Sequence, residues 1–392
     1  MKVALLTDAI HYPLTGIGRY CWELAQGLKE EVDRAADFEP IFIRHTGRCS
    51  FAALSRIAGD PGGGERQAST RTRFPLELLA ALRRHAGQNA VAASLYRRWS
   101  NFRVRQLLEK DKPKVLHGPN FTLPPGLEKG IATVVTVHDL SVWVNPNWHP
   151  SERVRYMRAT VPGSLERADR IVTISKSTAQ DLWQHFPKTK SKTVVIPLGV
   201  SRHWLQTPFP TERRGTICVS TIEPRKNIET LLAAYQRLPA RLREEHPLTL
   251  IGALGWRYEE TLALIRNAQR EGWLRYLRYV PEADLPALVA RARLSVYPSL
   301  YEGFGLPVLE ALAVGTPVIA GAHSSIPEVA PEHLATLLPH VAAPDSLAEA
   351  ILAELTRPWS DAAARRRRAH AQGRAWASCV QATLHLYRDL SG

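Results

Sequence analysis

One strand–turn–helix segment in the second half of the chain carries two glutamates and two glycines at a spacing suited to a nucleotide. Its members are Glu302, Gly303, Phe304, Gly305, Leu306 and Glu310. The free N–H groups and the dipole of a helix that begins near Leu306 favour a diphosphate. A carboxylate that accepts hydrogen bonds from vicinal hydroxyls is the usual way to hold a ribose. The pattern predicts that Glu302 and Glu310 bind two hydroxyl-rich parts of one ligand, although either glutamate alone would be an ordinary capping or surface residue.

Two adjacent cations, Arg225 and Lys226, form the second chemical pattern. They lie in the segment 220–227, which follows an apolar strand and opens the next helix. The carboxyl end of a strand is the usual ligand edge of an open α/β sheet. There, Arg can hold a diphosphate with its planar fork and Lys as a point charge. An exposed pair in a first helical turn is the alternative, but cations at a helix N-terminus oppose the dipole, so an anionic ligand explains them better.

Two weaker patterns lie at the ends of strands in the first half of the chain. Gly16 and Gly18 form a tight loop that enters a helix, which suits either close approach to a ligand or a plain turn. His138 and Asp139 end an apolar strand and are expected to face a crevice, although a lone histidine is often structural. Nothing in the sequence matches an Asp-x-Asp metal clamp, a Walker loop or a nucleophile elbow. We therefore expect chemistry without a metal.

Positioning these segments requires short apolar strands that alternate with amphipathic helices, and the chain shows this alternation along most of its 392 residues. The alternation predicts parallel sheets wrapped by helices. A proline-rich polar stretch, 207–215, interrupts it and indicates a linker. We predict an α/β protein with two Rossmann-like domains facing across a cleft, residues 1–206 and 207–370. A C-terminal helix over 371–392 is expected to pack back on the first domain.

Composition excludes several classes of protein. Apolar residues make up 45% of the chain and charged residues 22%, which is ordinary for globular domains and argues against disorder. No apolar run approaches the roughly 18 residues of a membrane span, and we expect no signal peptide. The four cysteines are far apart, which excludes a disulfide scaffold and favours the cytoplasm.

The positive charge is concentrated in the first half of the chain. Residues 1–205 carry 30 Lys and Arg against 18 Asp and Glu, whereas residues 206–392 carry 21 against 19. Within 74–114, aromatic residues and arginines are interleaved at helical spacing. This pattern suits an anionic membrane surface, and an ordinary domain helix with its arginines in water is the alternative. The net charge of +14 also fits a nucleic-acid-binding protein, but such basicity is generic, so we expect no nucleic acid as a partner.

Together these motifs resemble those of the retaining glycosyltransferases of family 4, which have the two-lobed GT-B fold. The resemblance covers nearly the whole chain, and its most specific part is the glutamate pair in the segment 302–310, EGFGLPVLE. Further support comes from EPRKN (223–227), VHDLS (137–141) and TGIGRY (15–20). Within the family, these motif sequences are similar to those of bacterial enzymes that build mannose- or rhamnose-containing surface polysaccharides from GDP-sugars.

The resemblance implies a role for each motif residue. Glu310 would hold the donor ribose and Glu302 would lie near the donor sugar. Arg225 and Lys226 would bind the diphosphate, and His138 would touch the sugar from the other lobe. The further donor contacts that it implies are made by Gly16, Gly18, Val280, Phe304, Gly305 and Leu306.

One position departs from the family pattern, because Thr221 stands where many relatives carry an arginine. We expect Arg225 to supply that positive charge instead. The family suggests front-face attack, in which the leaving phosphate oxygen helps to remove the acceptor proton and the configuration of the sugar is retained. No metal or other cofactor is implied, since fixed cations neutralise the leaving diphosphate.

The function implied by the resemblance is transfer of mannose or D-rhamnose from a GDP-sugar to a lipid-linked oligosaccharide during lipopolysaccharide O-antigen synthesis. The protein would act in the cytoplasm, peripherally on the anionic inner face of the bacterial membrane, with other glycosyltransferases of the pathway as candidate partners. Alternatives on the same scaffold are a transferase or epimerase that uses a UDP- or ADP-sugar, and a catalytically dead sugar-binding partner. An intact set of Glu302, Arg225 and Lys226 argues against the last.

Overall fold

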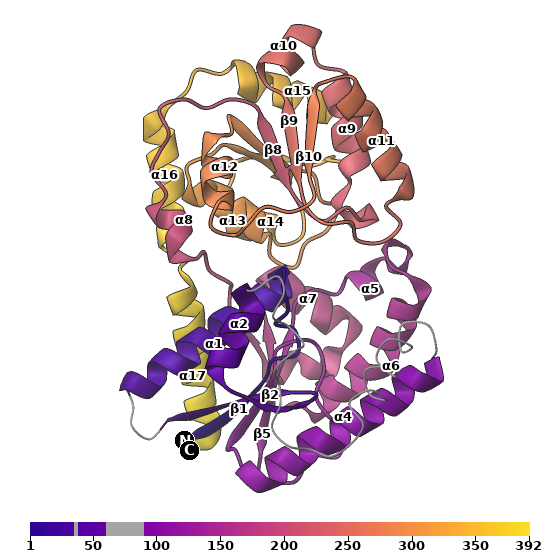
Figure 1. Ribbon diagram of the computed structural model, residues 1–392, viewed down its shortest axis with the longest axis vertical. Helices are drawn as coiled ribbons and strands as arrows, with labels where there is room; N and C mark the ends of the chain where they lie inside the picture. The colour runs from indigo at the N-terminus through magenta and orange to yellow at the C-terminus, as the bar shows by residue number, and fades with distance from the viewer. Residues whose placement is uncertain (35–37, 60–89) are drawn as a thin grey trace.

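Two α/β lobes are stacked along the long axis of the molecule, each with a central sheet between layers of helices (Figure 1). The computed structural model describes residues 1–34, 38–59 and 90–392. The N lobe contains the first sheet and the C lobe the second. The predicted fold class, two Rossmann-like α/β domains, is confirmed.

The sheet of the N lobe has seven strands in the order β3-β2-β1-β4-β5-β6-β7. They are β1 (Lys2–Leu6), β2 (Glu39–Arg44), β3 (Gly47–Cys49), β4 (Val115–Gly118), β5 (Ala132–Val137), β6 (Arg170–Thr173) and β7 (Thr193–Val195). All neighbours are parallel except β2 and β3. The central strands are apolar and buried on both faces, as parallel sheets require. Strand β3 was not predicted, because three residues at an edge give no hydrophobic alternation.

The sheet of the C lobe has six parallel strands in the order β10-β9-β8-β11-β12-β13. They are β8 (Thr216–Val219), β9 (Leu248–Ile251), β10 (Leu274–Leu277), β11 (Leu294–Tyr297), β12 (Val318–Gly321) and β13 (Thr336–Leu338). The short edge strand β13 was also missed by the sequence analysis. The strand order reverses between β8 and β11, and a parallel α/β sheet binds ligands at the carboxyl ends of such a pair. The segments 220–227 and 298–305 leave the sheet at this point.

Helices cover both faces of each sheet, and three apolar clusters fill the space between the layers. The N-lobe helices are α1 (Gly16–Arg34), α2 (Phe51–Gly59), α4 (Ala90–Asp111), α5 (Ser141–Val144), α6 (Ser151–Arg167) and α7 (Lys176–His185). The connection and the C lobe contain α8 (Arg202–Gln206), α9 (Ile228–Gln236), α10 (Ala240–Glu245), α11 (Glu259–Arg270), α12 (Leu285–Arg291), α13 (Leu306–Ala313), α14 (Ile326–Val329), α15 (Pro344–Thr356) and α16 (Asp361–Gln372). In the described part of the chain, no helix has both the length and the apolar composition to cross a bilayer.

Part of the basic segment 74–114 lies outside the described residues. The described part forms α4, in which Val104 and Leu108 pack into the N-lobe core, while Leu95 and Phe102 remain 53% and 49% exposed. One side of α4 therefore packs as in an ordinary domain helix, and two of its apolar side chains face solvent. Contact of α4 with a membrane remains a prediction.

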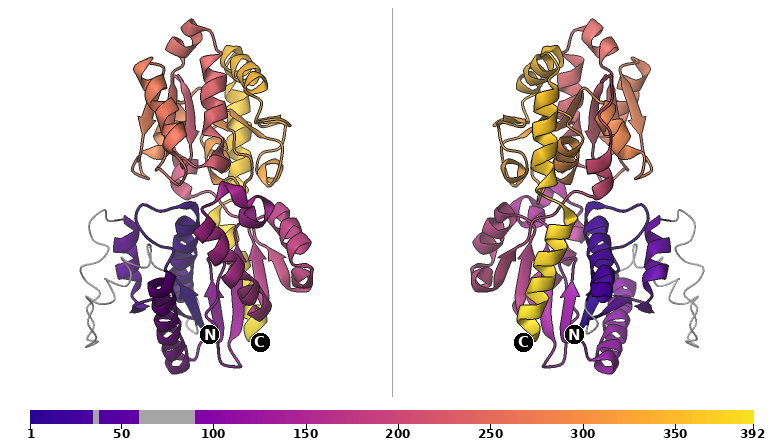
Figure 2. Two further views of the ribbon diagram at one scale, coloured as in Figure 1. Left: turned by 90° about the vertical axis from the view of Figure 1, so that its right-hand side faces the viewer. Right: turned by 90° about the vertical axis from the view of Figure 1, so that its left-hand side faces the viewer.

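The last helix, α17 (Trp376–Ser391), crosses from the C lobe and packs along α1 and β4 of the N lobe (Figure 2). A buried hydrogen-bond chain fixes it: His117 bonds the Tyr387 hydroxyl through Nδ1 (2.5 Å) and the Thr136 hydroxyl through Nε2 (2.7 Å). The two helices approach closely at Gly27, where an added Cβ would lie 2.3 Å from a methyl group of Val380. The C-terminal helix is thus an integral part of the N lobe.

This contact predicts that Gly27→Ala lowers stability even though Ala favours a helix over Gly by about 1 kcal/mol. The clash should cost about 1–3 kcal/mol, as overpacking of a core does, and thermal unfolding followed by circular dichroism measures it. The double variant Gly27→Ala/Val380→Ala should recover most of the loss. Gly59→Ala is the matched control, because no atom lies within 4 Å of its added Cβ. An equal loss in the control, or no rescue, would contradict close packing of α17 on α1.

Candidate active site

The donor-site segment predicted in the C lobe meets the N lobe at Gly303. An added Cβ at this glycine would lie 1.8 Å from the carbonyl oxygen of His138. The Thr178 hydroxyl, at the start of α7, donates to the carbonyl of Gly303 (3.2 Å) and lies 3.4 Å from the carbonyl of His138. The structure therefore brings together two motifs that are far apart in the sequence, and Gly303 permits this contact between the lobes.

Glu302 is held by two cations and a phenol. Its Oε1 accepts from Lys226 Nζ (2.5 Å) and from the Tyr297 hydroxyl (2.9 Å), and its Oε2 accepts from Arg225 (3.2 Å). Burial would raise the pKa of Glu302, but the charges of Lys226 and Arg225 outweigh it and hold the pKa below its ordinary value. The group is an ionised carboxylate with both oxygens engaged.

Arg225 is anchored by further negative charge. It donates to Glu223 (3.0 Å) and to the carbonyl of Tyr301 (2.8 Å), and the charge of Asp139 acts on it from the N lobe. The two cations lie in a short 3-10 turn between β8 and α9, on the carboxyl side of the strand as the sequence predicts, and not in the first turn of α9. Since carboxylates of the protein already compensate them, their charge alone does not require an anionic ligand. Their contact with a diphosphate remains a prediction.

Glu310 lies on α13 and is 7% exposed. Its carboxylate has no hydrogen-bond partner among the residues that the structure describes. Burial raises its pKa to about 8, the charge of Glu282 adds to this rise, and the charge of Arg19 opposes it. A buried carboxylate without a partner is costly, so Glu310 is suited to a ligand that donates hydrogen bonds.

The N-lobe glycines differ in their surroundings. Gly16, the first residue of α1, has no atom within 4 Å of an added Cβ, which leaves room for a ligand. Gly18 is buried, and its added Cβ would lie 2.9 Å from the carbonyl of Ala9, so its packing within the lobe requires a glycine. The structure thus gives Gly18 a structural reason that the sequence analysis did not foresee.

The side chain of His138 is buried and packs against the rings of Tyr20 and Phe121. Burial lowers its pKa to about 4, so it is neutral at pH 7. Nε2 donates to the carbonyl of Pro119 (2.7 Å), which leaves Nδ1 as an acceptor without a partner among the described residues. The side chain is therefore fixed in the N lobe and presents one free acceptor nitrogen.

The remaining predicted donor contacts surround the start of α13 and the end of β10. Gly305 caps α13 with a φ of +96°, which favours glycine, and Leu306 begins the helix. The Phe304 ring is buried in the core, so only its backbone is available to a ligand. Val280 packs partly against the same core, beside Tyr279, whose hydroxyl bonds Tyr12 of the N lobe at 2.5 Å.

Several residues of the site were not predicted from the sequence. They are Arg19, Glu223, Glu282, Tyr297 and Tyr301. Tyr301 donates to Asp181 of α7 (2.6 Å) and accepts from the Leu140 amide (3.2 Å), so it joins the lobes beside Glu302. Single aromatic or charged residues at these positions resemble ordinary core or surface residues. Only their place next to the recognised motifs was a signal.

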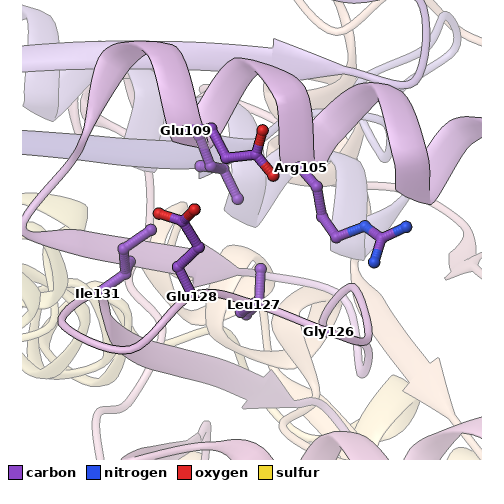
Figure 3. A pocket seen from close by; sticks show the side chains of 7 residues that line it. Arg105, Glu109, Gly126, Leu127, Glu128 and Ile131 are labelled. Carbon is purple, nitrogen blue, oxygen red and sulfur yellow. The ribbon is translucent and has the colours of Figure 1, made fainter.

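A small hollow of the N lobe lies away from this site. It lies between α4 and the loop before β5, and the side chains of Glu109 and Glu128 approach it from these two elements (Figure 3). That loop precedes β5, so the hollow lies at the amino ends of the strands, opposite the usual ligand edge. In residues 1–34, 38–59 and 90–392, no group of three or more His, Cys, Asp and Glu side chains could hold a metal ion.

Two family models together span most of the chain. The model described as Glycosyltransferase Family 4 matches residues 14–204, and the one described as Glycosyl transferases group 1 matches residues 205–376. Their shared boundary lies in α8, between the two sheets.

Individual proteins agree with the family models. The chain is 36% identical over 402 residues to the O-antigen chain mannosyltransferase B of Escherichia coli, with all of both chains covered. The crystal structure of WaaG, a glycosyltransferase involved in lipopolysaccharide biosynthesis, superposes with a TM-score of 0.71 at 18% identity and covers 98% of this chain and 99% of its own. Anabaena HepE in complex with UDP-glucose superposes with a TM-score of 0.67 at 17% identity, over 99% and 100% of the two chains. The chain therefore belongs to the family 4, group 1 glycosyltransferases, enzymes with the two-lobed GT-B fold.

Proposed function

We propose that this glycosyltransferase moves mannose or D-rhamnose, with retention of configuration, from a GDP-sugar to a lipid-linked glycan in O-antigen synthesis. The observation that carries the choice of sugar and pathway is the identity of 36% to an O-antigen chain mannosyltransferase over the full length of both chains. The geometry of Glu302 and Glu310 supports a nucleotide-sugar as the donor.

The ribose and the sugar fit two distinct parts of the site. Glu310 is a buried carboxyl group to which none of the described residues donates a hydrogen bond, and two vicinal hydroxyls of a ribose would satisfy it. His138 Nδ1 is a second free acceptor, in the opposite lobe, suited to a sugar hydroxyl. Gly16, at the exposed start of α1, leaves space for the diphosphate.

Positive charge for the leaving diphosphate is supplied by side chains. Lys226 and Arg225 lie together with the ionised Glu302, and the N-terminus of α13 begins three residues after Gly303. As charge develops on the phosphate, these fixed groups stabilise it without reorganising, which is the main electrostatic source of catalysis. We propose that no metal is needed, since Lys226 and Arg225 stabilise the charge that develops on the phosphate.

Glu302 is unsuited to the role of a covalent nucleophile. Both of its carboxylate oxygens accept charge-assisted hydrogen bonds, and its lowered pKa marks a weak base. A front-face mechanism is therefore favoured, in which the C1–O bond to the phosphate breaks towards an oxocarbenium-like state. The departing phosphate oxygen takes the proton of the acceptor hydroxyl, and that hydroxyl oxygen attacks C1 from the same face.

We propose that the N lobe binds both the acceptor and the membrane surface. On α4, the exposed Leu95, Arg98 and Phe102 lie on one side of the helix at spacings of three and four residues. Exposed arginines and Tyr156 on α6 lie on the neighbouring helix (Figure 1). A basic surface with apolar side chains suits peripheral binding to anionic lipid, where a lipid-linked glycan is located.

The donor prediction is tested by nucleotide release from GDP-, UDP- and ADP-sugars, with a bacterial lipid-linked glycan extract, in EDTA. We expect GDP release from GDP-mannose or GDP-D-rhamnose that depends on the acceptor. Lys226→Ala should be inactive while remaining folded, although its melting temperature should fall because Glu302 then keeps only Arg225 as a counter-charge. Preferential release of UDP or ADP would contradict the donor assignment, and loss of activity in EDTA would contradict the metal-free mechanism.

Glu310 predicts a proton linkage to nucleotide binding. With a pKa of about 8 the group is about 90% protonated at pH 7, and binding of a ribose to the carboxylate form releases close to one proton. Affinity for GDP should therefore rise about tenfold from pH 7 to pH 9, as the carboxyl ionises. Isothermal titration calorimetry in buffers of different ionisation enthalpy measures the proton directly.

Glu310→Gln is the control for this linkage. It should bind GDP about 10- to 100-fold more weakly at pH 9, because a charge-assisted hydrogen bond contributes about 1.5–3 kcal/mol. Its binding should release no proton and should be flat with pH. Wild-type affinity in this variant would remove Glu310 from the donor site.

Membrane binding is tested with the paired substitution Arg98→Glu/Phe102→Ser. It removes one cation and one exposed ring from α4, so co-sedimentation with phosphatidylglycerol vesicles should fall several-fold while GDP affinity is unchanged. The matched control is Arg266→Glu on α11, an exposed arginine of the C lobe. Equal loss in both variants would indicate that overall charge alone, and not this face of α4, determines binding.

A further inference from the structure

Arg19 lies at the contact between the lobes and serves no role in the mechanism described above. It follows Gly18 near the start of α1, and only 10% of its side chain is exposed. Its guanidinium forms an ion pair with Glu282, which lies in the C lobe between β10 and α12. A buried arginine on one lobe is thus held by a carboxylate on the other.

The same guanidinium also acts on Glu310. Burial would lower the pKa of Arg19, but the charges of Glu310 and Glu282 outweigh it and raise the pKa above its ordinary value. In turn, Arg19 is the positive group that opposes the raised pKa of Glu310. The three residues form one charge cluster, in which the N lobe supplies the cation and the C lobe both carboxyl groups.

Other charged groups near α13 are engaged elsewhere. Arg368 of α16 donates to the carbonyls of Ala313 and Thr207. Glu328 of α14 accepts from the backbone of α7, and His203 of α8 bonds Glu282 at 3.2 Å. The elements packed against α13 therefore leave Arg19 and Glu282 as the charges that act on Glu310.

The position of Arg19 is fixed by its backbone. Its amide donates to the carbonyl of Thr15 (2.8 Å), and the amide of Gly18 donates to the Thr15 hydroxyl (3.2 Å). The packing of Gly18 against the carbonyl of Ala9 leaves no room for a side chain there. The loop predicted to approach the diphosphate thus also sets the position of Arg19.

We propose that Arg19 is a positioning residue of the donor site: brought from the opposite lobe, it favours the ionised form of Glu310, which accepts hydrogen bonds from the nucleotide ribose. Glu282 orients the guanidinium but, as a second negative charge, opposes the ionisation of Glu310. Tight binding of the donor is therefore a property of the closed pair of lobes and not of the C lobe alone. This inference rests on the proposed function, in which Glu310 binds the ribose.

Two substitutions distinguish this role from a simple latch between the lobes. Arg19→Gln and Glu282→Gln break the same ion pair, so a latch would respond to both in the same direction. If Arg19 acts through the charge of Glu310, the two variants act in opposite directions, since one removes an attractive charge and the other a repulsive one.

The experiment measures GDP affinity from pH 6 to pH 10 in the full-length protein. The midpoint of the profile, expected near pH 8 in the wild type, should move up in Arg19→Gln and down in Glu282→Gln. Each upward shift of the midpoint by one pH unit weakens GDP binding about tenfold at pH 7. Arg19→Lys should recover much of the shift because it keeps the charge. Arg388→Gln is the control: it removes the ion-pair partner of Glu31, which lies on α1 like Arg19, and it should leave the midpoint unchanged.

The outcomes separate the inference from the proposed function. Shifts in the same direction for Arg19→Gln and Glu282→Gln, or no shift in either, overturn the role of Arg19 provided that Glu310→Gln still abolishes the pH dependence. If Glu310→Gln keeps wild-type affinity and profile, the ribose assignment itself is wrong and the inference falls with it. If Arg19→Gln disrupts the contact between the lobes, the sign of the shift in Glu282→Gln and the rescue by Arg19→Lys decide the outcome.

Discussion

The compensation of buried charge at the contact between the lobes is the constraint on which the rest of the site depends. Two cations, Arg225 and Lys226, lie among Glu302, Glu223 and Asp139, all largely removed from water. An isolated charge in such a place would be prohibitively costly, so each must lie near a charge of opposite sign. This requirement explains why the loops after β8 and β11 must be neighbours, and the strand order of the C-lobe sheet is what makes them so. Asp139 extends the same compensation across to the N lobe.

The contact between the lobes combines these compensating charges with close packing of the backbone. Gly303 allows the carbonyl of His138 to approach, and Tyr301 bonds both Leu140 and Asp181. On one side of this contact, Glu328 accepts from the amides of Lys176 and Ser177, at 2.9 and 2.7 Å, and so caps α7 from the opposite lobe. Under the proposed function, these contacts would keep water away from an activated sugar that it would otherwise hydrolyse. A glycosyltransferase needs that exclusion because water is always a competing acceptor.

The sequence predicted the central architecture well, for a physical reason. Buried parallel strands are continuous apolar runs, and a proline-rich linker interrupts their alternation with helices, so both sheets were recognisable. Three-residue edge strands such as β3 and β13 carry no such signal. The motifs around Glu302 and around Arg225 were each recognised, but their pairing with each other was not, since it depends on the order of strands in space. Arg19 was missed because a single arginine in an amphipathic helix is most simply a surface charge.

The geometry of the two crossings between the lobes limits how the site can open. The chain passes from the N lobe to the C lobe beyond Gly199 and returns at Ala375, and these segments lie against each other: Val200 pairs with Ala375, and an added Cβ on Gly199 would lie 2.2 Å from the amide nitrogen of Trp376. Two adjacent crossings define one hinge, because a motion that separates the lobes must turn about both together. Since α17 is fixed to α1 by packing at Gly27, this hinge is tied to the helix that carries Arg19. If the lobes open about this hinge, the positive charge of Arg19 moves away from Glu310, and under the proposed function the carboxylate that would bind the ribose then loses its counter-charge.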